Sequence, residues 1–144
     1  MPASEAQSPK KVKIIGCGVF EREVQSVIAD DADRFEVIMM DAGLHARPKE
    51  LKVRLQAEID TTSAEEFERI VVLYGLCGRG AVGIMARDVP LVFPRIHDCI
   101  AMFLGSADEY WKQFRACPAT FYMTPGWFEK KAHPDGYKIG RLKR

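Results

Sequence analysis

Residues 70–78 read Ile-Val-Val-Leu-Tyr-Gly-Leu-Cys-Gly, an apolar run that ends in a glycine-rich turn. A run that is apolar at every position, rather than at every second one, is typical of a strand buried on both faces of a parallel sheet. We therefore expect a central strand over Ile70–Tyr74. The chain on either side must then supply the neighbouring strands and the helices that cover them.

Apolar runs of strand length alternate along the chain with segments of helical periodicity. Strands are expected at Val12–Ile15, Phe35–Met40, Ile70–Tyr74, Leu91–Phe93 and Phe121–Met123. Helices are expected over about Phe20–Asp31, from Pro48 with Leu51, Leu55 and Ile59 buried, at Ile100, Phe103 and Leu104, and after a capping box at Ser106–Glu109, with a short apolar segment at Ala81–Ala86. This alternation predicts an α/β fold, a three-layer, doubly wound, mostly parallel sheet of five strands that is Rossmann-like or flavodoxin-like.

The composition is typical of one soluble globular domain, with 144 residues that are 47% hydrophobic and 28% charged. We expect a disordered leader over residues 1–10, a single α/β domain over 11–130 and a polar basic tail over 131–144. Twenty-one basic and twenty acidic residues leave a formal net charge of +1, which argues against a nucleic-acid partner. Since we find neither a secretion signal nor an apolar run of membrane length, we expect a cytoplasmic protein with reduced thiols and no membrane association.

Three of the four cysteines follow predicted strands. Cys17 follows the first strand, Cys77 the third and Cys99 the fourth. The carboxyl ends of parallel strands meet at one edge of a sheet, and open α/β sheets bind their ligands in the crevice there. The remaining cysteine, Cys117, precedes a proline at a predicted helix end, and we expect it to be structural.

Three soft sulfur ligands at one edge predict a metal ion or an iron–sulfur cluster. Thiolates are the metal-binding form and the N-terminus of a helix stabilises them; Cys99 opens a predicted helix and Cys17 precedes one. His97 is a candidate fourth ligand, a general acid or base, or a group that orients a ligand. Three sulfurs with His97 would suit tetrahedral zinc, whereas three cysteines around a four-iron cluster would leave one iron open for substrate.

Other residues at the same strand ends are candidates for catalysis or ligand binding. The catalytic candidates are His97, Asp98 and Arg95. The candidates for contact with a cofactor are Gly16, Gly18, Gly78, Arg79 and Trp127. We also expect Trp127, Arg95 and Tyr74 to flank the cleft, with Trp127 excluding water from one side.

Residues 78–83, Gly-Arg-Gly-Ala-Val-Gly, match the dinucleotide pattern Gly-x-Gly-x-x-Gly, which holds a phosphate at a helix N-terminus. The pattern follows the third strand here, whereas the fingerprint belongs to the first strand-to-helix turn, where Glu21 replaces the last glycine. The phosphate interpretation is therefore weak. Arg79 and Arg95 can still pair with a carboxylate or phosphate of a ligand.

Four short stretches resemble one family, in matching order. They are Tyr-Gly-Leu-Cys-Gly at Tyr74–Gly78, Pro-Arg-Ile-His-Asp-Cys at Pro94–Cys99, Leu-Gly-Ser at Leu104–Ser106 and Thr-Pro-Gly-Trp at Thr124–Trp127. The chain resembles the DUF1638 family, a domain of unknown function in archaea and bacteria, over about Val12–Trp127. The family pattern matches at Cys17, Cys77, His97 and Cys99. Members often lie near corrinoid-dependent methyltransferase genes, which implies one-carbon or metal-cofactor metabolism.

Three functions are compatible with this site. The first is metal or iron–sulfur binding by Cys17, Cys77 and Cys99, for which the resemblance implies a role in methyl-transfer metabolism. The second is a non-catalytic metallochaperone or accessory protein for a corrinoid methyltransferase. The third is a metal-free thiol enzyme with Cys17 or Cys77 as nucleophile and His97 as base. The expected partner is a small-molecule ligand or a methyltransferase protein, and the oligomeric state stays open.

Overall fold

The computed structural model describes residues 9–130, in which four strands form one sheet. They are β1 (Lys11–Cys17), β2 (Phe35–Met40), β3 (Phe67–Leu73) and β4 (Leu91–Val92), in the order β2-β1-β3-β4. All neighbouring pairs in the sheet are parallel. β3 is therefore an internal strand, as its apolar sequence predicted. This is the order of the first four strands in flavodoxin-like folds.

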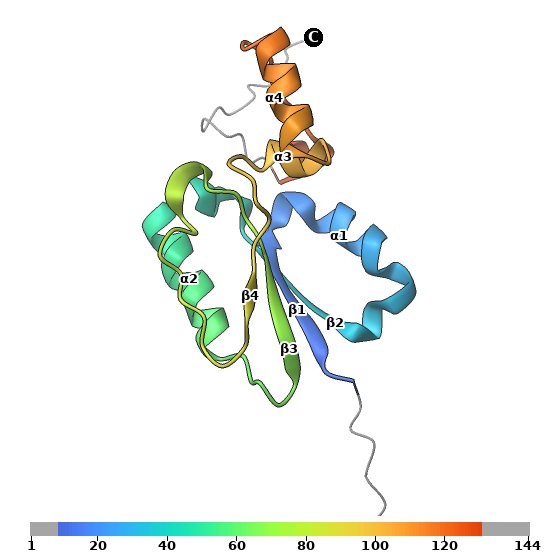
Figure 1. The fold of residues 1–144 in the computed structure, drawn as a ribbon, viewed down its shortest axis with the longest axis vertical. Coiled ribbons are helices and arrows are strands. Elements are labelled where there is room, and N and C mark those ends of the chain that lie inside the picture. Colours follow the sequence, from blue (N-terminus) through green and yellow to red (C-terminus); the bar gives the residue numbers. More distant parts are fainter. Residues whose placement is uncertain (1–8, 131–144) are drawn as a thin grey trace, which may run out of the picture.

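Two helical connections cover the two faces of the sheet. α1 (Glu21–Ile28) and the 3-10 segment η2 (Ala29–Arg34) lead from β1 to β2, and α2 (Pro48–Asp60) leads from β2 to β3. Figure 1 shows α1 and α2 on opposite sides of the strands. The predicted α/β architecture with helices on both faces of a parallel sheet is confirmed.

The sequence of α2 explains its position. Pro48 occupies the first turn, where its missing N–H is not needed. Leu51, Leu55 and Ile59 recur every fourth residue and are each no more than 3% exposed, so they form one stripe against the sheet. These are the three residues that the sequence predicted to be buried.

Within the described residues, three further helices follow β4. They are α3 (Ile100–Phe103), α4 (Ala107–Ala116) and α5 (Pro125–Glu129). The Ser106 hydroxyl accepts a hydrogen bond from the Glu109 N–H at 3.0 Å, so the predicted cap of α4 is present. Figure 1 places α3 and α4 beyond the carboxyl ends of the strands. None of the helices in the described part of the chain has the length and apolarity that crossing a membrane requires.

The predicted fifth strand, Phe121–Met123, is wrong. These residues have no regular secondary structure, and Phe121 and Met123 are more than half exposed. The edge strand β4 pairs with β3 at only two positions, so it offers little backbone for another strand to join. Tyr122 instead packs beside Tyr110 of α4, with ring centroids 6.3 Å apart.

Other predicted boundaries shift by a few residues. α1 ends at Ile28 and passes into η2, where Asp31 has a non-helical φ of −132°. Residues 81–86 form turns and irregular structure between β3 and β4, because Gly83 adopts a positive φ of 76° that a helix does not contain. Residues 1–8 of the predicted leader and the predicted tail over 131–144 lie outside the described residues.

Candidate functional site

The carboxyl ends of β1 and β3 form the point where the chain order of the sheet reverses. Cys17 is the last residue of β1 and lies opposite Met40 of β2, while Gly16 lies opposite Leu73 of β3. The connection from β1 leads to β2 on one side, and the connection from β3 leads to β4 on the other side. Open α/β sheets bind their ligands at the crevice between two such strands. The residues that follow β1 and β3 therefore define the candidate site.

The loop after β4 crosses directly over the end of β3. A β-carbon built on Gly75 would lie 2.9 Å from the carbonyl oxygen of His97 and 3.1 Å from the amide nitrogen of Cys99. These neighbours are main-chain atoms, so they cannot swing aside as a side chain can. Only glycine fits at position 75, and this contact brings the turn with His97 and Cys99 to the end of β3.

The turn η4 (Cys77–Arg79) contacts the segment that follows β2. Gly78 has a positive φ of 69°, and a β-carbon there would lie 3.2 Å from the carbonyl oxygen of His45 in η3 (Ala42–Ala46). A β-carbon built on Gly18, just after β1, would lie 3.0 Å from the carbonyl oxygen of Met40. The main chains that follow all four strands therefore meet at this end of the sheet.

The structure describes the side chains of three of the four cysteines and only the backbone of the fourth, Cys77. Cys17 is buried and precedes the 3-10 turn η1 (Gly18–Phe20), and Cys99 is half-buried and directly precedes α3. Cys77 begins η4, and its side chain lies outside what the structure describes. Cys117 ends α4 and is exposed, apart from the strand ends.

Among the described side chains, no group of three or more His, Cys, Asp or Glu is arranged to hold a metal ion. The side chain of Cys77, a member of the predicted set with Cys17 and Cys99, is not among them. The three-cysteine site therefore stays a prediction, supported by where the backbone places its members.

Tyr74, the first residue after β3, carries an unsatisfied hydroxyl. Its side chain is 8% exposed, and its hydroxyl oxygen is buried with no hydrogen-bond partner among the described residues. Burial raises the pKa of the Tyr74 hydroxyl well above its usual value, and the charges of Cys17 and Asp41 raise it further. The hydroxyl is thus close enough to Cys17 to feel its charge, as expected for a residue beside the thiols.

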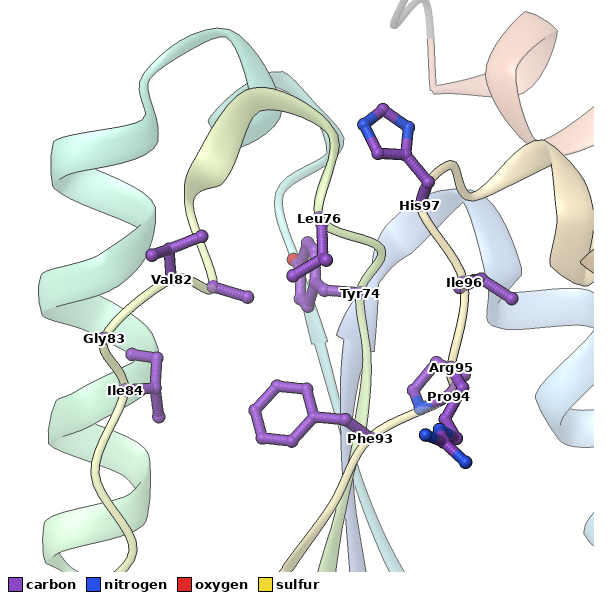
Figure 2. Close-up of a pocket in the computed structure, with 11 residues that line it drawn as sticks. Tyr74, Leu76, Val82, Gly83, Ile84, Phe93, Pro94, Arg95, Ile96 and His97 are labelled. Carbon is purple, nitrogen blue, oxygen red and sulfur yellow. The ribbon is translucent and has the colours of Figure 1, made fainter.

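A pocket of about 660 Å³ opens next to Tyr74. Its lining comes from two segments and from Tyr74 itself: Leu76, Ala81, Val82, Gly83 and Ile84 after β3, and Phe93, Pro94, Arg95, Ile96 and His97 after β4. Figure 2 shows Val82 and Ile84 across from Ile96 and His97, with Tyr74 and Phe93 between them. The volume lies within the range of about 300–1,000 Å³ that is usual for small-molecule sites.

The three catalytic candidates separate into two roles. Arg95 and His97 are exposed and line the pocket. Asp98 instead accepts a hydrogen bond from the Ile100 N–H at 2.8 Å, which caps the start of α3. Its carboxylate is therefore engaged in holding the turn, while Arg95 and His97 face a space that a ligand can enter.

Trp127 lies at the carboxyl end of β1 but outside the pocket. It is buried in α5, with its ring 5.9 Å from Phe103, whose ring stacks on Phe20 at 4.3 Å. The neighbouring Gly126 packs against the main chain of Val19 in η1. Trp127 thus anchors α5 on the turn after Cys17 rather than lining the space beside Tyr74.

The glycine pattern at residues 78–83 does not form a phosphate cradle of the dinucleotide type. The residues make η4 and a series of turns, and no helix follows them before β4. Arg79 is exposed, with a positive φ of 60°. Gly16 allows the close packing of β1 on β3, since a β-carbon at this position would lie only 3.1 Å from the Leu73 side chain.

The sequence predicted a cleft flanked by Tyr74 and Arg95, but it did not predict the pocket wall formed by residues 76–84. The pocket brings residues 76–84 next to residues 93–97, and neither segment has a periodic pattern. The signal available in the sequence was the presence of the apolar residues Leu76 and Val82 within a glycine-rich stretch, and the structure shows both side chains exposed, at 54% and 41%. Exposed apolar side chains that gather around a hollow mark a ligand site more often than chance would.

Comparison with known proteins identifies a family but no activity. No curated protein and no solved structure matches the chain. A family model described as a protein of unknown function, DUF1638, matches residues 39–142, well over half of the chain. The matched range contains Cys77, His97 and Cys99, whereas Cys17 precedes it. The chain therefore belongs to the DUF1638 family.

Proposed function

We propose that the chain binds a metal ion or an iron–sulfur cluster through Cys17, Cys77 and Cys99. The observation that carries this proposal is the contact of Gly75 with the His97–Cys99 turn. It holds the loop that bears Cys99 against the end of β3, two residues before Cys77. The adjacent strand β1 ends at Cys17. The support is the placement of the backbone, which gathers the three loops at one end of the sheet.

The chemistry of the donor set fits a soft metal or a cluster. Cysteine sulfurs are the ligands that zinc and iron–sulfur clusters prefer, and His97 lies on the same turn as Cys99. The burial of Cys17 would keep competing water away. The Tyr74 hydroxyl has no hydrogen-bond partner among the described residues and lies near Cys17, so it would be able to donate a hydrogen bond to a sulfur ligand or to a bound group. When bound, zinc would supply a Lewis acid and a cluster a redox or substrate-binding centre.

Metal analysis and a visible spectrum of the anaerobically purified chain test this proposal. A broad brown absorbance with bound iron and sulfide would identify a cluster, and about one colourless zinc per chain would identify a zinc site. Protein that holds neither would overturn the proposal. The variant His97→Ala then resolves the role of the histidine: loss of metal marks a ligand, and retained metal marks an acid, a base or an orienting group.

A metal-free thiol enzyme is the second candidate, and the position of His97 favours it. His97 lines the pocket beside Tyr74, where a substrate would meet an imidazole close to the cysteine-bearing loops. In this alternative Cys17 or Cys77 attacks the substrate and His97 accepts the proton. Metal-free protein whose alkylation rate falls in His97→Ala would favour it. An accessory role for a corrinoid methyltransferase rests on the family resemblance and adds a partner protein to either alternative.

A further inference from the structure

The polar side chains that line the pocket are all hydrogen-bond donors or cations. They are the Arg95 guanidinium and the His97 imidazole; Tyr74 also lines the pocket, but its hydroxyl oxygen is buried. No Asp or Glu is among the lining residues. A cationic ligand would find no counter-charge there, whereas an anion would meet a guanidinium that can hold a carboxylate with two hydrogen bonds.

Among the described residues, Arg95 forms no ion pair with an Asp or Glu. The ion pairs among residues 9–130 engage other arginines, such as Arg54 with Glu50 at 2.7 Å and Arg87 with Asp60 at 2.8 Å, but not Arg95. A guanidinium at the mouth of an apolar pocket is therefore left to interact with solvent or with a ligand. This is the arrangement of a site in which one charge orients a mostly apolar molecule.

The walls of the pocket match an apolar body. Phe93, Ile84 and Ile96 are half-buried, and Leu76 and Val82 are exposed at its edge. In water, each of these side chains keeps apolar surface that a ligand would cover, at about 25 cal/mol per Å². Figure 2 shows the side chains of Phe93 and Ile84 directed into the space between the two segments.

We propose that this pocket binds a small carboxylate with an apolar body, with Arg95 holding the carboxylate at the mouth and the apolar part lying between Ile84, Phe93 and Ile96. A carboxylate fits better than a phosphate, because the lining offers one guanidinium and no helix begins among the lining residues. This site uses none of the cysteines. The pocket proposal therefore goes beyond the metal proposal. Because Tyr74 borders both the pocket and Cys17, the carboxylate would also be the substrate class of the proposed metal site.

Calorimetric titration of the purified full chain with hexanoate tests the inference. Hexanoate should bind about tenfold more tightly than butanoate, because two more methylenes are buried. Hexylammonium, which has the same chain and the opposite charge, should not bind. The variant Arg95→Gln should weaken hexanoate binding about fivefold, since the guanidinium is exposed and screened. The matched control Arg115→Gln removes an exposed arginine on α4, away from the pocket, and should change nothing.

Three results would each overturn the inference: no hexanoate binding, equal binding of hexylammonium, or unchanged binding in Arg95→Gln. The metal content of the same samples separates this result from the proposed function. Metal-containing protein that ignores hexanoate would contradict the pocket alone. Metal-free protein that binds hexanoate through Arg95 would contradict the metal site and leave the pocket in place.

Discussion

Gly75 lies against the main chain of His97, so closely that a β-carbon on Gly75 would come within 2.9 Å of the His97 carbonyl oxygen. This contact joins the carboxyl ends of β3 and β4, because it fixes where the loop after β4 crosses the sheet. His97, Cys99 and one wall of the pocket all belong to that loop. The position of every proposed ligand on it depends on a glycine at position 75.

The variant Gly75→Ala tests this relationship. The added methyl group meets main-chain atoms, so the loop must shift, and we expect the free energy of unfolding to fall by about 1–3 kcal/mol. Urea denaturation measures the change. Gly43→Ala is the control, since its β-carbon would meet only the exposed carboxylate of Asp41, a side chain that can shift at the cost of no more than its hydrogen bond from the Gly43 N–H. Equal losses in the two variants would show that the loop contact is not tight.

A second prediction concerns the buried charge of Lys13 in β1. Its ammonium group lies 3.3 Å from a Glu36 oxygen and 3.5 Å from a Glu58 oxygen, and its side chain is 7% exposed. Both carboxylates keep contact with water, so they remain solvated if the lysine is removed. We therefore expect Lys13→Met to change the free energy of unfolding by less than about 1 kcal/mol, because methionine fills the same space. Lys13→Ala leaves a cavity and should cost about 2–4 kcal/mol. Thermal unfolding that is equally impaired in both variants would contradict this.

A third prediction uses the raised pKa of Tyr74. The folded chain holds the phenolic proton above pH 10, where a tyrosine in the unfolded chain loses it at its ordinary pKa of about 10. The unfolded state then binds fewer protons than the folded state, so stability falls as the pH rises above about 10.

In Tyr74→Phe this part of the alkaline loss should disappear. At pH 7 the variant should be as stable as the wild type or more stable, because the removed hydroxyl has no hydrogen-bond partner within the part of the chain that the structure describes. Urea denaturation from pH 8 to pH 11 checks both points; parallel alkaline losses in the two proteins would refute the assignment to Tyr74.

A fourth prediction distinguishes the four-stranded sheet from the five strands that the sequence indicated. Backbone amides of Ile15 and Val72, inside the sheet and fully buried, should exchange with solvent deuterium slowest. Amides of residues 121–123 should exchange orders of magnitude faster, since they belong to no strand. Slow exchange at residues 121–123 would mean that they pair with an edge of the sheet in solution.

Local patterns were reliable where burial and periodicity agree. The strand Phe35–Met40 was predicted with its observed bounds, and α2 begins at the predicted Pro48 with the predicted Leu51, Leu55 and Ile59 inside. In these elements the same side chains that set the local conformation also face the core. The prediction then needs no knowledge of distant parts of the chain.

Patterns failed where tertiary contacts decide. Phe121–Met123 is apolar like a strand, but it has no regular secondary structure, and Tyr122 packs beside Tyr110 of α4 instead. The pocket requires residues 76–84 to face residues 93–97, and only the crossing of the loop after β4 over Gly75 creates that arrangement. For the site, Cys17 ends β1, while Cys77 and Cys99 lie in the turns that follow β3 and β4. The predicted roles of the site residues stay predictions, and the structure shows that the Asp98 carboxylate accepts a hydrogen bond from the Ile100 N–H.

The most direct test of the proposed function is the metal content per chain of four single variants, purified anaerobically beside the wild type. Cys17→Ser, Cys77→Ser and Cys99→Ser should each lose most of the bound metal, because each removes one of the three thiolates. Cys117→Ser is the matched control, since Cys117 is exposed at the end of α4, and it should keep the wild-type content. Equal metal content in all four variants would contradict the three-cysteine site.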